Sequence, residues 1–136
     1  MSSSGYTDDC EHLNLYRGSV ERAIRGKRGQ AFLKEMAEAM DAMPEKVLIA
    51  DEIVTAEGDV CGIGSVAVAR GMDVSHLDPQ DPHGIAKAFG IAYAMAAEIE
   101  YMNDEWGSPA ETPEHRWTRM RKWVSENIHG RANDAD

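Results

Sequence analysis

Residues 60–106 read VCGIGSVAVARGMDVSHLDPQDPHGIAKAFGIAYAMAAEIEYMNDEW, and the fold is organised around this stretch. Twice within it a short apolar run meets a glycine and turns, at Gly71 and again at Gly90. Glycine adopts without strain the left-handed conformation that ends many helices. The stretch therefore predicts helices over about 61–70, 82–89 and 92–104, with Gly71 and Gly90 at the corners.

The second corner spaces Ala86, Gly90, Ile91 and Ile99 as a helix-turn-helix does. A helix that reads DNA meets phosphates and base edges with Arg, Lys, Asn or Gln. Residues 92–105 offer only Asn103 for this purpose. The same segment is acidic, through Glu98, Glu100, Asp104 and Glu105. An ordinary helical corner is therefore favoured over a DNA reader, and the acidic side is expected to face outward.

Helices are also predicted on both sides of this stretch. Residues 13–25 partly fit helical spacing, and 30–43 carry a regular apolar stripe that Pro44 ends. Residues 113–128 have the clearest start signal, with Thr112 at the N-cap and Pro113 in the first turn.

Residues 46–55 (KVLIADEIVT) are rich in β-branched side chains, and a turn signal follows them at 57–59. The expected fold is mainly α, a small domain of five or six helices over 13–130, with a short β-hairpin near 47–66 as an alternative for that segment. Residues 1–12 and 131–136 are expected to be flexible tails.

The composition indicates a single globular domain. The chain has 136 residues, 43% of them hydrophobic, and a net charge of −10. An acidic protein repels nucleic acid at long range and suits a basic partner, although solubility alone explains such a charge. No apolar run approaches the roughly 18 residues of a membrane span, and the N-terminus has no signal-peptide pattern. Cys10 and Cys61 form no disulfide framework, so a reducing cytoplasm is expected.

Two charged segments are candidate binding sites. The turn RGKRG places Arg25, Lys27 and Arg28 where they could bind an anion, although a solvated face is the simpler interpretation. The candidate protein-binding surface is the acidic end of residues 92–106, formed by Glu98, Glu100, Asp104, Glu105 and Trp106. A basic helix over 113–128 could instead pack against such acids and neutralise them.

No catalytic, metal or cofactor site is predicted. His76, Asp78, Asp81 and His83 have no standard ligand spacing, and two prolines interrupt them. Cys61 or Ser65 could act as a nucleophile with one of five histidines, but no spacing selects a pair. The methionines fall at apolar helical positions and are expected to fill the core.

Three segments carry a resemblance: SVERAIRGKRGQAFLKEM, VCGIGSVAVARGMDVSHLDP and NDEWGSPAETPEHRWTRMRKWV. Over roughly residues 15–128 the chain resembles small uncharacterised proteins of tailed bacteriophages and prophages. That resemblance implies a phage-encoded protein in the cytoplasm of a bacterial host, and it transfers no catalytic or binding residue.

The leading hypothesis is a non-enzymatic phage accessory protein that binds a host or phage protein, such as a regulator or an inhibitor of host defence. Two alternatives remain open, a helix-turn-helix DNA-binding regulator and an unrecognised small enzyme. A protein partner is expected, homo-oligomerisation is left open, and nucleic acid and membrane partners are disfavoured.

Overall fold

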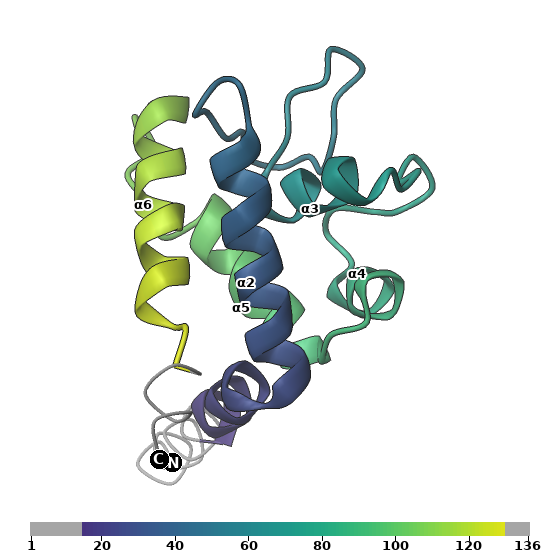
Figure 1. Ribbon diagram of the computed structural model, residues 1–136, viewed down its shortest axis with the longest axis vertical. Helices are drawn as coiled ribbons and strands as arrows, with labels where there is room; N and C mark the ends of the chain where they lie inside the picture. The colour runs from purple at the N-terminus through teal and green to yellow at the C-terminus, as the bar shows by residue number, and fades with distance from the viewer. Residues whose placement is uncertain (1–14, 130–136) are drawn as a thin grey trace, which may run out of the picture.

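A computed structural model describes residues 15–129, and within that range the chain is mainly helical, as predicted (Figure 1). The two segments expected to be flexible tails, 1–12 and 131–136, lie outside the described residues. Helical residues 15–25 are followed by α2 (Lys27–Ala42), α3 (Gly62–Arg70), α4 (Pro82–Phe89), α5 (Tyr93–Asp104) and α6 (Pro113–Glu126).

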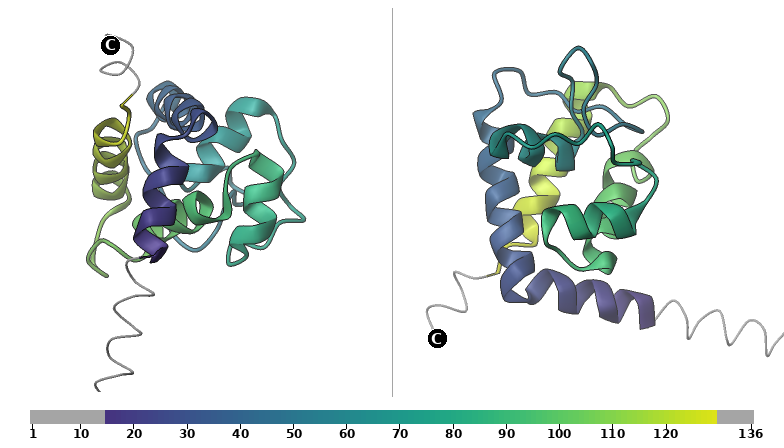
Figure 2. Two further views of the ribbon diagram at one scale, coloured as in Figure 1. Left: turned by 90° about the horizontal axis from the view of Figure 1, so that it is seen from below. Right: turned by 90° about the vertical axis from the view of Figure 1, so that its right-hand side faces the viewer.

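Helix α5 lies at the centre of the molecule. It packs against α4, α3 and α6, while α2 crosses in front of it and contacts α3 and α6 (Figure 1). Residues 15–25 turn away from α2 and run along the base of the molecule (Figure 2). The quoted stretch 60–106 therefore supplies the interior helix and two of its neighbours, which confirms its organising role.

Methionine supplies several of the most deeply buried side chains of the core. Met36, Met40, Met95 and Met120 are completely buried, together with aliphatic side chains such as Ile99. Methionine is unbranched and flexible, so it fills the irregular spaces between helices that cross at different angles. The expected role of the methionines is therefore confirmed.

The predicted helix ends are present. Gly71 and Gly90 adopt the left-handed conformation, with φ of 70° and 75°. The Thr112 hydroxyl accepts a hydrogen bond from the His115 N–H at 3.1 Å, and Pro113 begins α6. Helix α2 ends at Ala42, two residues before Pro44. These ends are set by local chemistry, which is why the sequence predicts them.

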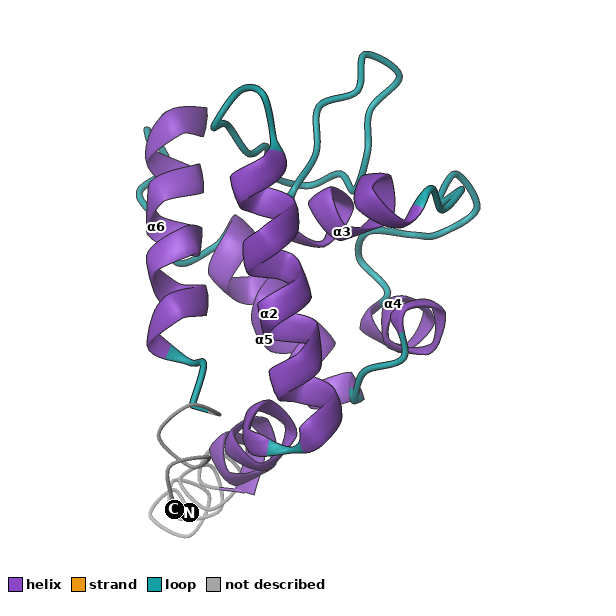
Figure 3. Cartoon of the chain, viewed as in Figure 1, coloured by secondary structure: helices purple, strands orange, loops and turns teal. Residues whose placement is uncertain are grey.

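The alternative of a β-hairpin near 47–66 is wrong. The described chain contains no strand, only loops between helices (Figure 3), and Val54 and Val60 form one isolated antiparallel bridge. Other elements take the backbone groups that a ladder would need. The Leu48 N–H donates to the Pro113 carbonyl at 3.1 Å, and the Ile49 carbonyl accepts from the Asn103 side chain at 2.9 Å.

Segment 49–61 instead forms a loop held tightly against α3. A Cβ atom placed on Gly64 would lie 2.0 Å from the Ile53 carbonyl oxygen, so only glycine fits there without displacement. The Cys61 N–H donates to that same carbonyl at 3.1 Å and fixes the base of the loop. The close approach of this loop to α3 therefore depends on the absence of a side chain at Gly64.

Candidate functional site

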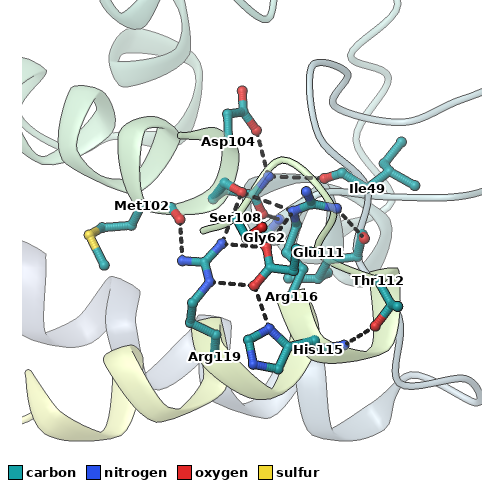
Figure 4. A network of polar contacts seen from close by, with 12 residues as sticks. Ile49, Gly62, Met102, Asp104, Ser108, Glu111, Thr112, His115, Arg116 and Arg119 are labelled. Carbon is teal, nitrogen blue, oxygen red and sulfur yellow. Dashed lines mark hydrogen bonds and ion pairs between the residues drawn. The ribbon is translucent and has the colours of Figure 1, made fainter. Parts of the chain in front are cut away.

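The largest polar cluster joins the end of α5 to the start of α6 (Figure 4). At its centre the Glu111 side chain is only 1% exposed and pairs with Arg119 through two contacts of 2.7 and 2.9 Å. Arg116 lies 3.4 Å from the same carboxylate, and the His115 ring nitrogen Nδ1 lies 2.7 Å from it. The hydrogen bonds from Arg119, the largest cause, hold the pKa of Glu111 at about 2.

The same arginines close the C-terminal end of α5. Arg119 donates to the Met102 and Asn103 carbonyls, and Arg116 donates to the Asn103 carbonyl at 3.0 Å. Helix α5 has no basic residue in its own last turn, so these guanidinium groups supply the positive charge that a helix C-terminus favours. Farther along α6, Arg121 pairs with Asp41 at 2.8 Å. The arginines of α6 therefore hold the fold together.

Asn103 connects three segments from the interior. It is 2% exposed, accepts from the Gly62 N–H at 3.1 Å, and donates to the Ile49 carbonyl and the Asp104 carboxylate at 2.9 and 2.6 Å. This was the only residue of α5 suited to reading bases. Because Asn103 is buried and α5 is the central helix, the helix-turn-helix corner does not present a reading surface.

The acidic side of α5 faces outward only in part. Glu98 is buried, so the expectation that it faces solvent is wrong; burial, followed by the charge of the Glu98 carboxylate, raises the pKa of Tyr16. Glu100 and Asp104 are half-buried, and burial followed by neighbouring carboxylates raises the pKa of Glu100. Burial is also the first cause of the raised pKa of Asp104.

The end of this helix does present a small exposed surface. Glu105 is exposed, and Trp106 is 59% exposed and meets the Tyr101 ring edge-on at 6.1 Å. Of the five candidate protein-binding residues, Glu105 and Trp106 are thus the most accessible, Glu100 and Asp104 are partly accessible, and Glu98 is not.

The candidate anion-binding residues Arg25, Lys27 and Arg28 are all exposed at the start of α2. Arg28 reaches the Gly90 carbonyl at 3.4 Å, and none of the three has an ion-pair partner within residues 15–129. The segment that carries them joins helical residues 15–25 to α2 at the base of the molecule (Figure 1).

The residues considered for catalysis and metal binding have structural roles or lie apart. The Cys61 thiol caps α3 by accepting from the Gly64 N–H, and burial raises its pKa to about 11. The Ser65 hydroxyl donates to the Gly62 carbonyl at 2.6 Å. In the described part of the chain, no three His, Cys, Asp or Glu side chains form a group that could hold a metal ion. This includes the connector that carries His76, Asp78, Asp81 and His83.

The most distinctive hollow on the surface is an apolar groove that sequence analysis missed. It has a volume of about 420 Å³ and lies between the end of α2, the following link, the 57–60 turn and α3. Its walls are mostly small or apolar: Ala39, Ala42, Met43, Pro44, Val47, Val60, Val68 and Ala69. Val68 is 59% exposed here and begins the exposed last turn of α3, whose earlier residues are buried.

Three carboxylates border this groove, and we call Glu45, Glu57 and Asp59 the acidic rim. All three are exposed, and within the described residues none has an ion-pair partner. Lys46 is the only Lys or Arg between Met36 and Ala69, and it points elsewhere. Its ammonium group donates to the Asp41 and Met43 carbonyls and lies 5.7 Å from the Trp117 ring centroid.

A tight turn sets two rim residues in place. The Thr55 N–H donates to the Asp59 carbonyl, and the Thr55 hydroxyl accepts from the Asp59 N–H at 3.0 Å. Gly58 has φ of 93°, a conformation that L side chains rarely adopt. The turn signal at 57–59 was visible in the sequence, but the groove was not, because its walls come from three separate segments.

No protein-family model, curated protein or solved structure matches the chain. Among residues 15–129, no helix combines the length and apolar character needed to cross a bilayer. The functional argument therefore depends on the surface of the molecule itself.

Proposed function

We propose that this is a protein-binding accessory protein whose groove holds the apolar face of a Lys- or Arg-bearing segment of its partner. The observation that carries the proposal is the pairing of an apolar hollow with three unpaired carboxylates. Asp41 and Glu111 have arginine partners, but other exposed acids such as Glu105 have no ion pair within residues 15–129, so the apolar hollow beside the acidic rim is the part that carries the argument.

The two parts of the groove have separate tasks in this proposal. Burial of Val68 and the alanine walls against a partner supplies the affinity, at about 25 cal/mol for each Å² of apolar surface removed from water. The acidic rim adds under about 1 kcal/mol for each exposed ion pair, but it selects basic partners and accelerates their approach. An amphipathic helix with basic flanks has the required pattern.

The resemblance to small phage and prophage proteins supplies the biological setting of the proposal. The partner is then a host or phage protein in the cytoplasm of a bacterial host, and binding serves to regulate phage expression or inhibit host defence. The exposed end of α5, with Glu105 and Trp106, is a second surface that a partner could reach.

A designed peptide tests the chemistry of the groove directly. A fluorescent amphipathic helix of leucine and lysine should bind in an anisotropy titration, and its affinity should fall as salt rises. The same peptide with glutamate at each lysine position should not bind. Glu57→Lys combined with Asp59→Lys should abolish binding of the basic peptide, whereas Lys34→Glu, on an exposed position of α2, should leave it unchanged.

The natural partner can be captured by a photo-crosslinker at position 68, inside the groove. Bacterial lysate should yield a cross-linked protein that disappears when Glu57 and Asp59 are replaced by lysine. A crosslinker at Lys87, exposed on α4, serves as the control. If the groove and control positions capture the same proteins, and the peptide fails to bind, the proposed function is wrong.

A further inference from the structure

The molecule carries at its base a surface complementary to its own groove. In helical residues 15–25, the side that faces away from the core presents Leu15, Arg22 and Arg25, spaced i, i+7 and i+10. Leu15 is 69% exposed, and both arginines are exposed without an ion-pair partner in residues 15–129. We call this surface the basic face. It combines an apolar side chain with positive charges on one helix.

The basic face and the groove lie at opposite ends of the molecule. Residues 15–25 run along the base, whereas the loop that carries Glu57 and Asp59 projects from the far end in two perpendicular views (Figures 1 and 2). The basic face of one molecule therefore cannot enter the groove of that same molecule.

We propose that the basic face of a second copy of this chain occupies the groove, so that self-association competes with partner binding. In this arrangement Leu15 enters the apolar hollow, and Arg22 and Arg25 pair with the acidic rim. The inference rests on the proposed function for the character of the groove, and it adds the chain itself as a ligand.

The dimensions and charges fit this arrangement. Leu15 and Arg25 are separated by about 15 Å along a helix that rises 1.5 Å per residue, so one helix can place a leucine in the hollow and arginines on its border. The net charge of −10 opposes association at long range. At about 0.15 M salt, however, the Debye length of roughly 8 Å leaves local pairs effective while the wider repulsion is screened.

The contact is heterologous, because it joins two different surfaces. After two molecules pair, the complex still has one free groove and one free basic face, so assembly proceeds to a closed ring or an open chain rather than stopping at a two-fold dimer. A partner segment that fills the groove ends growth at that molecule.

Charge exchange tests the proposal. Sedimentation of the wild-type full chain at 0.15 M salt should show a mass that rises above the monomer with concentration. Glu57→Lys with Asp59→Lys should remain monomeric, and so should Arg22→Glu with Arg25→Glu. An equimolar mixture of the two variants should associate again, because each basic groove then meets an acidic face and each acidic groove a basic face.

Loss of folding in either variant would be detected by circular dichroism. Leu15→Asp provides a further variant that disrupts the apolar contact alone.

A monomeric wild-type protein across the concentration range, or a mixture that fails to associate although both variants are folded, would overturn the proposal. The Arg22→Glu, Arg25→Glu variant keeps an intact groove. If that variant binds the leucine–lysine peptide while the wild type remains monomeric, self-association is wrong and the proposed function stands. If neither association nor peptide binding occurs, both are wrong.

Discussion

The network around Glu111 and the groove bordered by Glu57 are both rich in carboxylates, but they use them differently. In the network, Glu111 is sealed from solvent between Arg116 and Arg119, and Arg119 also binds the end of α5 through the Met102 carbonyl. In the groove, the carboxylates of the acidic rim face solvent without partners in the described chain. The network therefore uses paired charge to maintain the fold, whereas at the acidic rim exposed carboxylates without a described ion-pair partner border an apolar hollow.

The strongest way to break the comparison is to remove Asn103, which joins the network to α3 and the 49–61 loop. Asn103→Ala leaves the Gly62 N–H and the Ile49 carbonyl without their partners. Each unsatisfied buried group costs about 1–3 kcal/mol, so the free energy of unfolding should fall by about 3–4 kcal/mol. Urea denaturation measures the loss. Glu105→Ala, exposed at the same end of α5, should change the stability by less than about 0.5 kcal/mol.

The next largest loss of stability is expected at low pH, where Glu111 becomes protonated. The pKa of Glu111 is about 2 in the folded protein and 4.5 without these contacts, so the unfolded chain takes up the proton first as the pH falls. The stabilisation, on the order of 3 kcal/mol, is fully present above about pH 5 and is lost progressively towards pH 2.

Glu111→Gln provides the matched control for this pH dependence. It should be less stable than the wild type near pH 6, and the difference in unfolding free energy should shrink as the pH is lowered. Glu100 and Asp104 contribute with the opposite sign, because their pKa values are raised, but they are common to both proteins. A constant difference from pH 6 to pH 3 would contradict the assignment to Glu111.

A smaller loss of stability is expected at Gly64, where the loop beside the groove packs closely against α3. Gly64→Ala forces the added methyl group against the Ile53 carbonyl, and we expect a loss of about 2 kcal/mol in thermal or urea unfolding. Gly18→Ala is the contrasting substitution, since its nearest neighbour would be the Arg22 guanidinium at 3.4 Å. It should stabilise the helix by up to about 1 kcal/mol. If Gly64→Ala caused no loss of stability, the loop would be free to move away from α3.

The substitution with the smallest expected effect on stability tests the comparison most directly, because it changes the acidic rim alone. Glu57→Lys combined with Asp59→Lys should leave the free energy of unfolding within about 0.5 kcal/mol of the wild type, since neither side chain has a described ion-pair partner. The same pair should abolish binding of a basic amphipathic peptide. A large loss of stability would mean that the acidic rim belongs to the fold.

The features predicted from sequence are those that depend on neighbouring residues. Gly71, Gly90 and Thr112 end or begin helices through contacts within one turn, and the methionine stripe of α2 follows from helical spacing. The long-range partners were not predictable. Nothing near Glu98 in the sequence indicates the Tyr16 hydroxyl that meets it, and nothing near Asn103 indicates Gly62.

The groove escaped prediction for a related reason. Small side chains such as the alanines of α2 and α3 can line a hollow, or they can let two helices pack closely. The sequence pattern of alanines is the same in both cases. Only the three-dimensional placement of the 57–60 turn beside them distinguishes the two cases. The hairpin alternative failed similarly, because Pro113 and Asn103 take the backbone groups of Leu48 and Ile49.

Gln30 determines how the molecule can be presented to other surfaces. Its buried amide donates to the Asn127 carbonyl at 2.9 Å and accepts from the His129 N–H at 2.7 Å, so the last described residues lie beside the start of α2. Residue 15 lies at this base as well, away from the groove (Figure 1). A molecule tethered to a biosensor chip at this base, through residue 15 or 129, would hold its groove towards the flowing solution and its basic face towards the support. In that orientation the groove can bind a peptide from solution, while the basic face cannot reach the groove of another molecule. Peptide binding can therefore be measured without self-association.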